Sequence, residues 1–105
     1  MAKVNLGGKE IETDEDGFIQ EPDKWDNAVA EDIAKVEQAY PMGEDHWKLV
    51  NYLRDYYIKY EIAPPIRMLV KQTGIDLKKI YALFPGGPAK GACKVAGLPK
   101  PTGCV

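Results

Sequence analysis

The sequence predicts a mostly α-helical fold, a small orthogonal bundle of about five helices with an N-terminal β-hairpin and a flexible C-terminal arm. Apolar residues recur at helical spacing through most of residues 23–96, and proline and glycine breaks separate the periodic segments. A chain of 105 residues is long enough for one core. We therefore expect a single helical domain over residues 1–97 and a mobile arm over residues 98–105.

Alternating residues on either side of a Gly-Gly pair predict the hairpin over residues 3–13, with Val4 facing Ile11. The acidic turn Asp14-Glu15-Asp16-Gly17 follows. Its spacing departs from that of a calcium loop, because the twelfth position is Trp25 and not a glutamate. We therefore predict a solvated turn.

Two longer helices are predicted next. The first is capped by Asp23 and stopped by Pro41, and its apolar face consists of Val29, Ile33, Val36 and Tyr40. The second runs from about Glu44 to Tyr60, and its broad buried face consists of Trp47, Leu49, Val50, Leu53, Tyr56, Tyr57 and Tyr60. Tyrosines at helical spacing are typical of a core with hydroxyls at its rim, so we prefer that interpretation to a base-stacking surface.

Two short helices are predicted after Pro64-Pro65, and together they have a helix-turn-helix shape. The first carries Ile66, Leu69 and Val70 and ends at Gly74. Asp76 caps the second, and Ile75 and Ile80 flank this cap as a hydrophobic staple. The apolar stripe of the second helix consists of Leu77, Ile80, Tyr81 and Phe84.

A last helix is predicted between Pro88 and Gly97. One of its faces consists of small residues, namely Ala89, Ala92, Cys93 and Ala96, and we expect the following arm to be the partner that covers this face. Cys104 stands eleven positions after Cys93, and the prolines and glycines between them disfavour helix and strand. At about 3.3 Å per residue the extended segment spans up to roughly 36 Å.

The two cysteines carry the chemistry. A thiolate is the reactive form of cysteine, and thiol–disulfide exchange requires that one sulfur atom come close enough to attack another. We expect an exposed reactive thiol at Cys104 and a partly sheltered resolving thiol at Cys93. A permanent disulfide and two inert cysteines are the alternatives, and the second of these fits Cys93 alone. Apart from the two cysteines, the one histidine of the chain is His46, so no metal site is predicted. The sequence also has no nucleophile–base pair or phosphate-binding loop that would indicate an enzyme acting alone.

Charge differs between the two halves of the chain. Residues 1–60 carry fourteen acids against seven Lys and Arg (net −7), whereas residues 61–105 carry two acids against seven (net +5). Such a basic half can attract an acidic protein, a nucleic acid or a small anion. No long apolar run or signal peptide is present, so we expect a cytoplasmic protein that does not insert into membranes.

Four stretches resemble the DsrC/TusE family of sulfur-transfer proteins, and they extend over nearly the whole chain. They are D-E-D-G-F-I (14–19), H-W-K-L-V-N-Y-L-R-D-Y-Y (46–57), I-A-P-P-I-R (62–67) and L-F-P-G-G-P-A-K-G-A-C-K-V-A-G-L-P-K-P-T-G-C-V (83–105). Members with only the penultimate cysteine resemble tRNA-thiolation relay proteins, and members with both cysteines resemble the sulfite-reductase partner. This sequence has both.

The resemblance implies a sulfur carrier and redox partner of siroheme dissimilatory sulfite reductase in sulfate respiration, a protein co-substrate or gamma subunit and not an enzyme by itself. Cys104 would accept partly reduced sulfur, and Cys93 would close on it to leave a trisulfide. The alpha and beta subunits of the partner would hold the siroheme and iron–sulfur clusters, and this chain would bind no cofactor. A membrane-linked thiol–disulfide reductase complex would restore the thiols. Arg67, Lys90 and Lys100 would dock anionic sulfur or the partner.

Two alternatives stay open. A TusE-like relay for tRNA 2-thiouridine synthesis would need Cys104 alone. A DNA-binding module would use the helix-turn-helix, but its second helix offers only Lys78 and Lys79, with no Arg, Asn or Gln to read bases. This argues against sequence-specific binding. The direction of sulfur flow, reductive or oxidative, is open as well.

Overall fold

The computed structural model describes residues 2–100, and for Ala89 it describes the backbone only. The elements are β1 (Ala2–Leu6), β2 (Lys9–Thr13), η1 (Pro22–Lys24), α1 (Asn27–Val36), α2 (Glu44–Tyr60), α3 (Ile66–Thr73), α4 (Leu77–Leu83), the π-helical η2 (Pro88–Ala92) and α5 (Cys93–Val95). The predicted fold class is confirmed, because the described part of the chain holds five α-helices and a two-stranded antiparallel hairpin.

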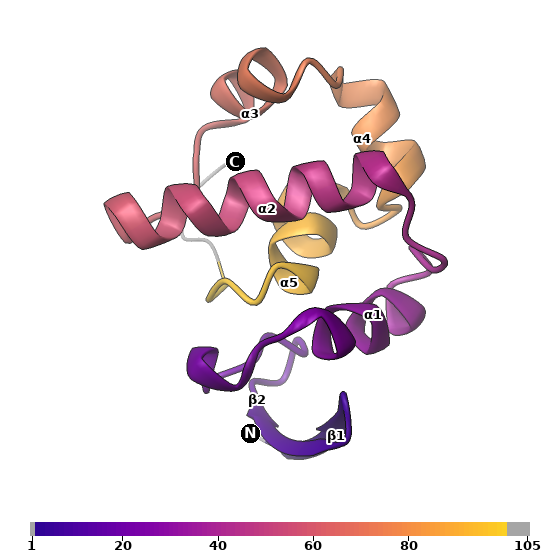
Figure 1. Cartoon of the computed structure of the whole chain (residues 1–105), viewed down its shortest axis with the longest axis vertical. Coiled ribbons are helices and arrows are strands. Elements are labelled where there is room, and N and C mark those ends of the chain that lie inside the picture. Colours follow the sequence, from indigo (N-terminus) through magenta and orange to yellow (C-terminus); the bar gives the residue numbers. More distant parts are fainter. Residues whose placement is uncertain (1, 101–105) are drawn as a thin grey trace.

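The long helix α2 crosses the middle of the molecule (Figure 1). α1 and the hairpin lie on one side of it, and α3 and α4 lie on the other. α5 sits between α1 and α2 and packs against both. The last helix is therefore the centre of the fold rather than an appendage to it.

The hairpin has the predicted register, with Val4 opposite Ile11. Ile11 is fully buried. The turn docks on α1, because Gly7 has a φ of 60° and a Cβ there would lie 2.8 Å from the backbone nitrogen of Val29. The Gly7 amide donates a hydrogen bond to Asp32 Oδ2 at 2.7 Å, which fixes the approach.

α1 is shorter than predicted. Its N-cap is Asp26, whose carboxylate accepts a hydrogen bond from the amide of Val29, and the predicted cap Asp23 lies in η1 instead. The helix ends at Val36, and the chain turns away before the expected apolar face is complete. Val36 and Tyr40 are consequently 73% and 48% exposed, so their predicted place on the buried face is wrong.

α2 has the predicted bounds, but its buried face is narrower than expected. The fully buried positions are Leu49, Val50 and Leu53. Trp47, Tyr56 and Tyr57 are half-buried, and Tyr60 is 51% exposed. The prediction that Tyr60 belongs to the core is wrong, because the last turn of α2 projects beyond the body (Figure 1).

α3 and α4 are joined as predicted. Gly74 ends α3 with a φ of 73°, and the carboxylate of Asp76 caps α4 by accepting a hydrogen bond from the amide of Lys79 at 2.8 Å. Only one side of the predicted α4 stripe is buried. Ile80 and Phe84 are fully buried, whereas Leu77 and Tyr81 are 39% and 51% exposed, contrary to the prediction.

Candidate functional site

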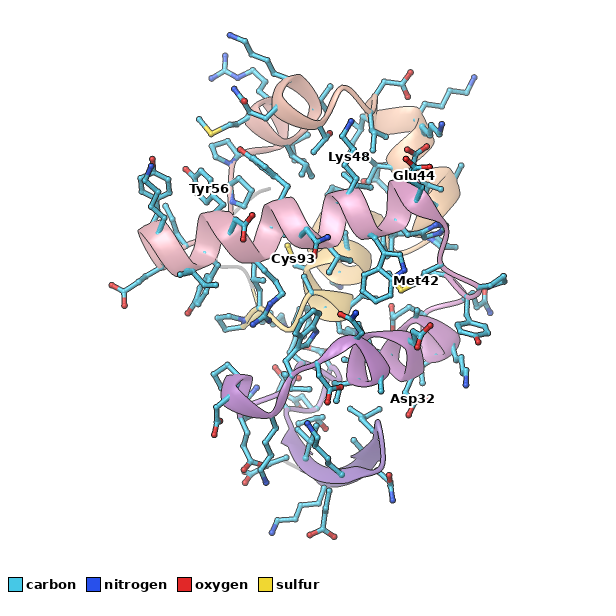
Figure 2. All side chains as sticks on the ribbon, viewed as in Figure 1. Asp32, Met42, Glu44, Lys48, Tyr56 and Cys93 are labelled. Atoms are coloured by element: carbon cyan, nitrogen blue, oxygen red, sulfur yellow. The ribbon has the colours of Figure 1, made fainter. Side chains whose placement is uncertain are left out.

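Cys93 lies at the junction of η2 and α5 and is only 3% exposed. Figure 2 shows it near the centre of the molecule. Burial raises the pKa of its thiol to about 12, because a thiolate is poorly solvated among apolar groups. Cys93 is therefore more deeply sheltered than predicted, and in this arrangement it is a protonated thiol at neutral pH.

Helices of the body pack against the small-residue face around Cys93. Ala92 and Ala96 are fully buried, and α5 packs against both α1 and α2. The close approach that alanines permit is thus made between helices of the fold. The prediction that the arm is the partner for this face stays a prediction, because residues 101–105 of the arm lie outside the described residues; Leu98, the first residue of the predicted arm, is buried in the same core cluster as Cys93.

Two side chains from distant elements hold the C-terminal end of α5. The indole Nε1 of Trp25 donates a hydrogen bond to the carbonyl of Val95 at 2.9 Å, and Nη1 of Arg54 donates one to the carbonyl of Ala96 at 2.8 Å. The guanidinium also lies 3.8 Å from the centroid of the Trp25 ring, a cation–π contact. We call Trp25 and Arg54 the exit clamp.

Burial lowers the pKa of Arg54, an effect that the neighbouring charge of Asp55 partly offsets. The guanidinium stays charged at any ordinary pH, because the unperturbed pKa of arginine is above about 12. A hydrogen bond from a charged donor to a carbonyl is stronger than one between neutral groups. Arg54 therefore contributes a firm contact to the end of α5.

The chain turns sharply after the exit clamp. Gly97 has a φ of 76°, and a Cβ at this position would lie 2.4 Å from Cδ1 of the Trp25 ring. The next residue, Leu98, is 2% exposed, and its amide donates a hydrogen bond to the carbonyl of Cys93 at 3.1 Å. The anchored part of the chain thus includes Leu98, which the sequence placed at the start of the arm.

The three candidate docking cations lie on different elements. Arg67 is exposed on α3, and Lys90 is exposed in η2 next to the last helix. Lys100 is exposed and donates a hydrogen bond to a carboxylate oxygen of Asp16, in the acidic turn. This hydrogen bond and the opposite charges lower the pKa of Asp16 and raise the pKa of Lys100.

Lys94, four residues after Lys90 in the sequence, forms its contacts inside the fold. Its Nζ forms an ion pair with Glu37 Oε2 at 3.0 Å, and the two side chains are only 12% and 17% exposed. The same ammonium lies 5.2 Å from the centroid of the Phe18 ring. Lys94 thus connects α5 to the end of α1 and to the buried aromatic ring next to the acidic turn.

Sequence reasoning missed the exit clamp. In the sequence, Trp25 was considered only as the position where a calcium loop would have a glutamate, and Arg54 was considered only as part of the family motif at residues 46–57. Cys104, the predicted sulfur acceptor, lies among residues 101–105, outside the residues that the structure describes. Its predicted role therefore remains a prediction.

Within residues 2–100, no three His, Cys, Asp or Glu side chains come together in a way that could hold a metal ion. His46 is engaged in the fold, because its Nδ1 accepts a hydrogen bond from the amide of Gly43 at 3.0 Å and its Nε2 donates one to the carbonyl of Leu83 at 3.1 Å. In the same part of the chain, the helices are too short or too polar to span a bilayer.

A family model described as "DsrC like protein" matches residues 5–105. The chain belongs to this family. The gamma subunit of dissimilatory-type sulfite reductase from Nitratidesulfovibrio vulgaris is 51% identical to it over 105 residues, which is the whole of both chains. The family resemblance of the sequence motifs is thus confirmed.

Two further DsrC-like relatives help to place the chain. The sulfurtransferase TusE of Escherichia coli is 42% identical, with 93% of this chain and 95% of that protein covered. The crystal structure of the oxidized gamma subunit (DsrC) from Archaeoglobus fulgidus superimposes with a TM-score of 0.88 at 51% identity, covering 99% of this chain and 100% of that one. The chain is therefore similar both to a sulfite reductase subunit and to a sulfurtransferase.

Proposed function

We propose that this chain is a cytoplasmic sulfur carrier and redox partner of a siroheme dissimilatory sulfite reductase. One observation carries the proposal. The chain is 51% identical throughout to a reductase gamma subunit, and it has two cysteines eleven positions apart, of which Cys93 is fixed at the centre of the fold and Cys104 lies near the end of the sequence. The chain would act as a protein co-substrate for the alpha and beta subunits.

In the proposed reaction, sulfur from sulfite ends as the middle atom of a trisulfide between Cys104 and Cys93. One sulfite and two thiols take up two electrons and four protons and give one trisulfide and three waters. The reductase, through its siroheme and iron–sulfur clusters, supplies these two electrons, and oxidation of the thiols supplies two more. A membrane-linked thiol–disulfide reductase complex would then return both cysteines to thiols.

The burial of Cys93 supports its role as the second sulfur to react. With its pKa raised to about 12, the Cys93 thiol is almost entirely protonated at neutral pH and is a weak nucleophile toward free reagents. It reacts when a sulfur atom is delivered to it. This division of labour leaves Cys104 as the acceptor of new sulfur and Cys93 as the resolving group.

The test is intact-protein mass spectrometry after incubation with the reductase, sulfite and an electron donor. We expect a species that is heavier than the reduced chain by one sulfur atom less two hydrogen atoms, and in which neither cysteine can be alkylated. Cys104→Ala should abolish the added sulfur. Cys93→Ala should leave the sulfur attached to Cys104 alone, as a labile adduct without a bridge to a second cysteine. An unchanged mass for the wild-type chain would rule out the proposal.

A second candidate function is a TusE-like sulfur relay for tRNA 2-thiouridine synthesis, which the 42% identity to the sulfurtransferase supports. This relay needs only the penultimate cysteine, so Cys93→Ala should keep full activity in a tRNA-thiolation assay. Loss of that activity in the variant would exclude the relay.

The helix-turn-helix interpretation is weakened by the surroundings of its second helix. Nζ of Lys79 forms an ion pair with Asp45 at 2.8 Å, which leaves Lys78 as the cation of α4 without an ion pair in the described part of the chain. A gel shift that disappears at moderate salt would indicate nonspecific attraction only.

A further inference from the structure

We propose that a groove beside the exit clamp is the place where the reductase docks, and that the docked segment of the reductase carries one carboxylate next to apolar side chains. η1, the last turns of α2 and the chain that follows α5 meet at this groove (Figure 1). We call it the docking groove, and the residues that give it its character are Pro22, Arg54, Tyr57, Ile58, Glu61 and Leu98. The inference rests on the proposed function, because the partner is the reductase of that proposal.

The lining of the docking groove is largely apolar, and part of it is open to solvent. The groove encloses about 240 Å³. Ile58 is 71% exposed, Pro22 is exposed, and Tyr57 is half-buried. Large apolar side chains that gather at a concave part of the surface are typical of a site that binds a partner. Burial of Ile58 would remove apolar surface from water, so apolar side chains of a partner fit this part of the groove.

Arg54 determines the charge that the docking groove accepts. Its guanidinium has five N–H groups, and within residues 2–100 the structure shows one hydrogen bond from them, from Nη1 to the carbonyl of Ala96. None of the ion pairs among the same residues includes Arg54, although burial makes its charge harder to solvate and lowers its pKa. A carboxylate of the partner would supply a counter-charge, and an arginine can bind it through two parallel hydrogen bonds.

Glu61 limits the negative charge of the docked segment. It follows the last residue of α2 and lines the same groove as Arg54. Its carboxylate would repel a second acidic side chain, so a continuous acidic stretch does not match this pattern of charges. We therefore expect one carboxylate directed toward Arg54, with apolar or basic side chains directed toward Ile58 and Glu61.

The position of the docking groove connects it to the candidate functional site. The amide of Leu98 donates a hydrogen bond to the carbonyl of Cys93, and Arg54 holds the end of α5, so the groove is preformed and fixed relative to Cys93. Preformed surfaces lose less conformational entropy on binding. Both cysteines lie within six residues of Leu98 in the sequence, and six residues span at most about 20 Å. A protein that exchanges sulfur with them therefore comes close to the groove, which is why we assign the groove to the reductase.

The test measures binding of the full chain to the purified complex of the reductase alpha and beta subunits by isothermal titration calorimetry. The variants are Ile58→Glu and Ile58→Lys, which remove the same apolar side chain and introduce opposite charges. Ile58→Glu places a carboxylate one helical turn from Arg54, where it would compete with the carboxylate of the partner. We expect it to weaken binding by about tenfold or more. Ile58→Lys loses the apolar contact alone, and we expect it to weaken binding by about fivefold.

Val36→Glu and Val36→Lys are the matched controls. Val36 is 73% exposed at the end of α1 and does not line the docking groove, and the two variants change the net charge by the same amounts as the Ile58 variants. Their affinity for the reductase should match that of the wild type. Circular dichroism checks that all four variants are folded. If Ile58→Glu is unfolded, salt titration of wild-type binding tests the carboxylate instead, because screening should lower the affinity as salt increases, and an unchanged affinity would contradict the inference.

Two results with folded variants would overturn the inference. One is wild-type affinity in Ile58→Glu, and the other is equal weakening by the two Ile58 variants, which would leave no part for a carboxylate of the partner. At saturating concentrations of the chain, Ile58→Glu should still gain sulfur in the mass-spectrometric assay, since only docking is changed. A wild-type chain that neither binds the reductase nor gains sulfur would instead refute the proposed function itself.

Discussion

Raising the pH from 8 to 10 should weaken the native fold through Cys93. The pKa of its thiol is about 12 in the fold against a reference value of 9.0. Since the folded-state pKa is the higher one, the unfolded chain releases this proton first, and stability falls as pH rises from about 9 toward 12. With these two values, the free energy of unfolding loses about 1.4 kcal/mol between pH 8 and pH 10.

The assay is urea unfolding of the wild type and of Cys93→Ala at both pH values, with reductant present. Lysines and tyrosines titrate in both proteins, so their effects cancel in the difference. At pH 8 the variant should be the less stable of the two, because a buried side chain is shortened. At pH 10 that deficit should shrink by about 1.4 kcal/mol.

The matched control is Ala96→Gly, which removes a buried methyl group from the same face and titrates nothing. Its deficit should be the same at both pH values. If the deficit of Cys93→Ala is also independent of pH, then the thiol is not held protonated by burial, and the argument for Cys93 as the second sulfur to react fails.

Three further predictions test the surroundings of the site. In a urea titration, Gly97→Ala should lower the free energy of unfolding by well over the roughly 1–2 kcal/mol that a left-handed backbone costs a residue with a side chain, because the added Cβ would also clash with the indole of Trp25. Gly8→Ala is the control: Gly8 has a φ of 79° and no atom within 4 Å of an added Cβ, so this variant should lose only the free energy that the left-handed backbone costs. Lys100→Met should raise the carboxylate pKa of Asp16 toward its reference value of 3.8 in an NMR titration, and an unmoved pKa would remove this ion pair from the solution structure. Asp76→Ala should destabilise the chain by about 1 kcal/mol and Asp76→Asn by less, and equal losses would show that the cap is unimportant.

Local signals predicted much of the fold. The hairpin register follows from a Gly-Gly turn between alternating residues, and the bounds of α2 follow from a long helical period between breaks. The cap of α4 follows from Asp76 alone, because an aspartate side chain accepts a hydrogen bond from a nearby amide without help from the rest of the fold. Each of these features depends on neighbours in the sequence.

The extent of burial was predicted less well. Val36, Tyr60 and Tyr81 all continue a helical apolar pattern, and all three are more than half exposed. A periodic pattern shows which side of a helix faces the core but not where the neighbouring elements stop. The body ends before these positions, and only the packing of α1, α2 and α4 determines that limit.

The exit clamp could not be predicted for a related reason. Its acceptors are backbone carbonyls, which every residue has, and its donors lie 70 and 42 residues away from them. No spacing rule connects a tryptophan, an arginine and a helix end over such separations. The one local signal was Gly97, read as the end of a helix, but its crowding against the indole became visible only in the fold.

Folding neutralises part of the positive charge in the basic half of the sequence (residues 61–105). Lys94 is paired with Glu37, and Lys100 is paired with Asp16, so two cations of the C-terminal half are partly neutralised by acids of the N-terminal half. The charge that faces a partner at the base of the arm is therefore smaller than the sequence count indicates. Since Lys100 must leave Asp16 before it can bind another anion, its docking role competes with an existing ion pair. Exposed Lys90, for which no ion pair is found among the described residues, is the better candidate to attract an anionic partner.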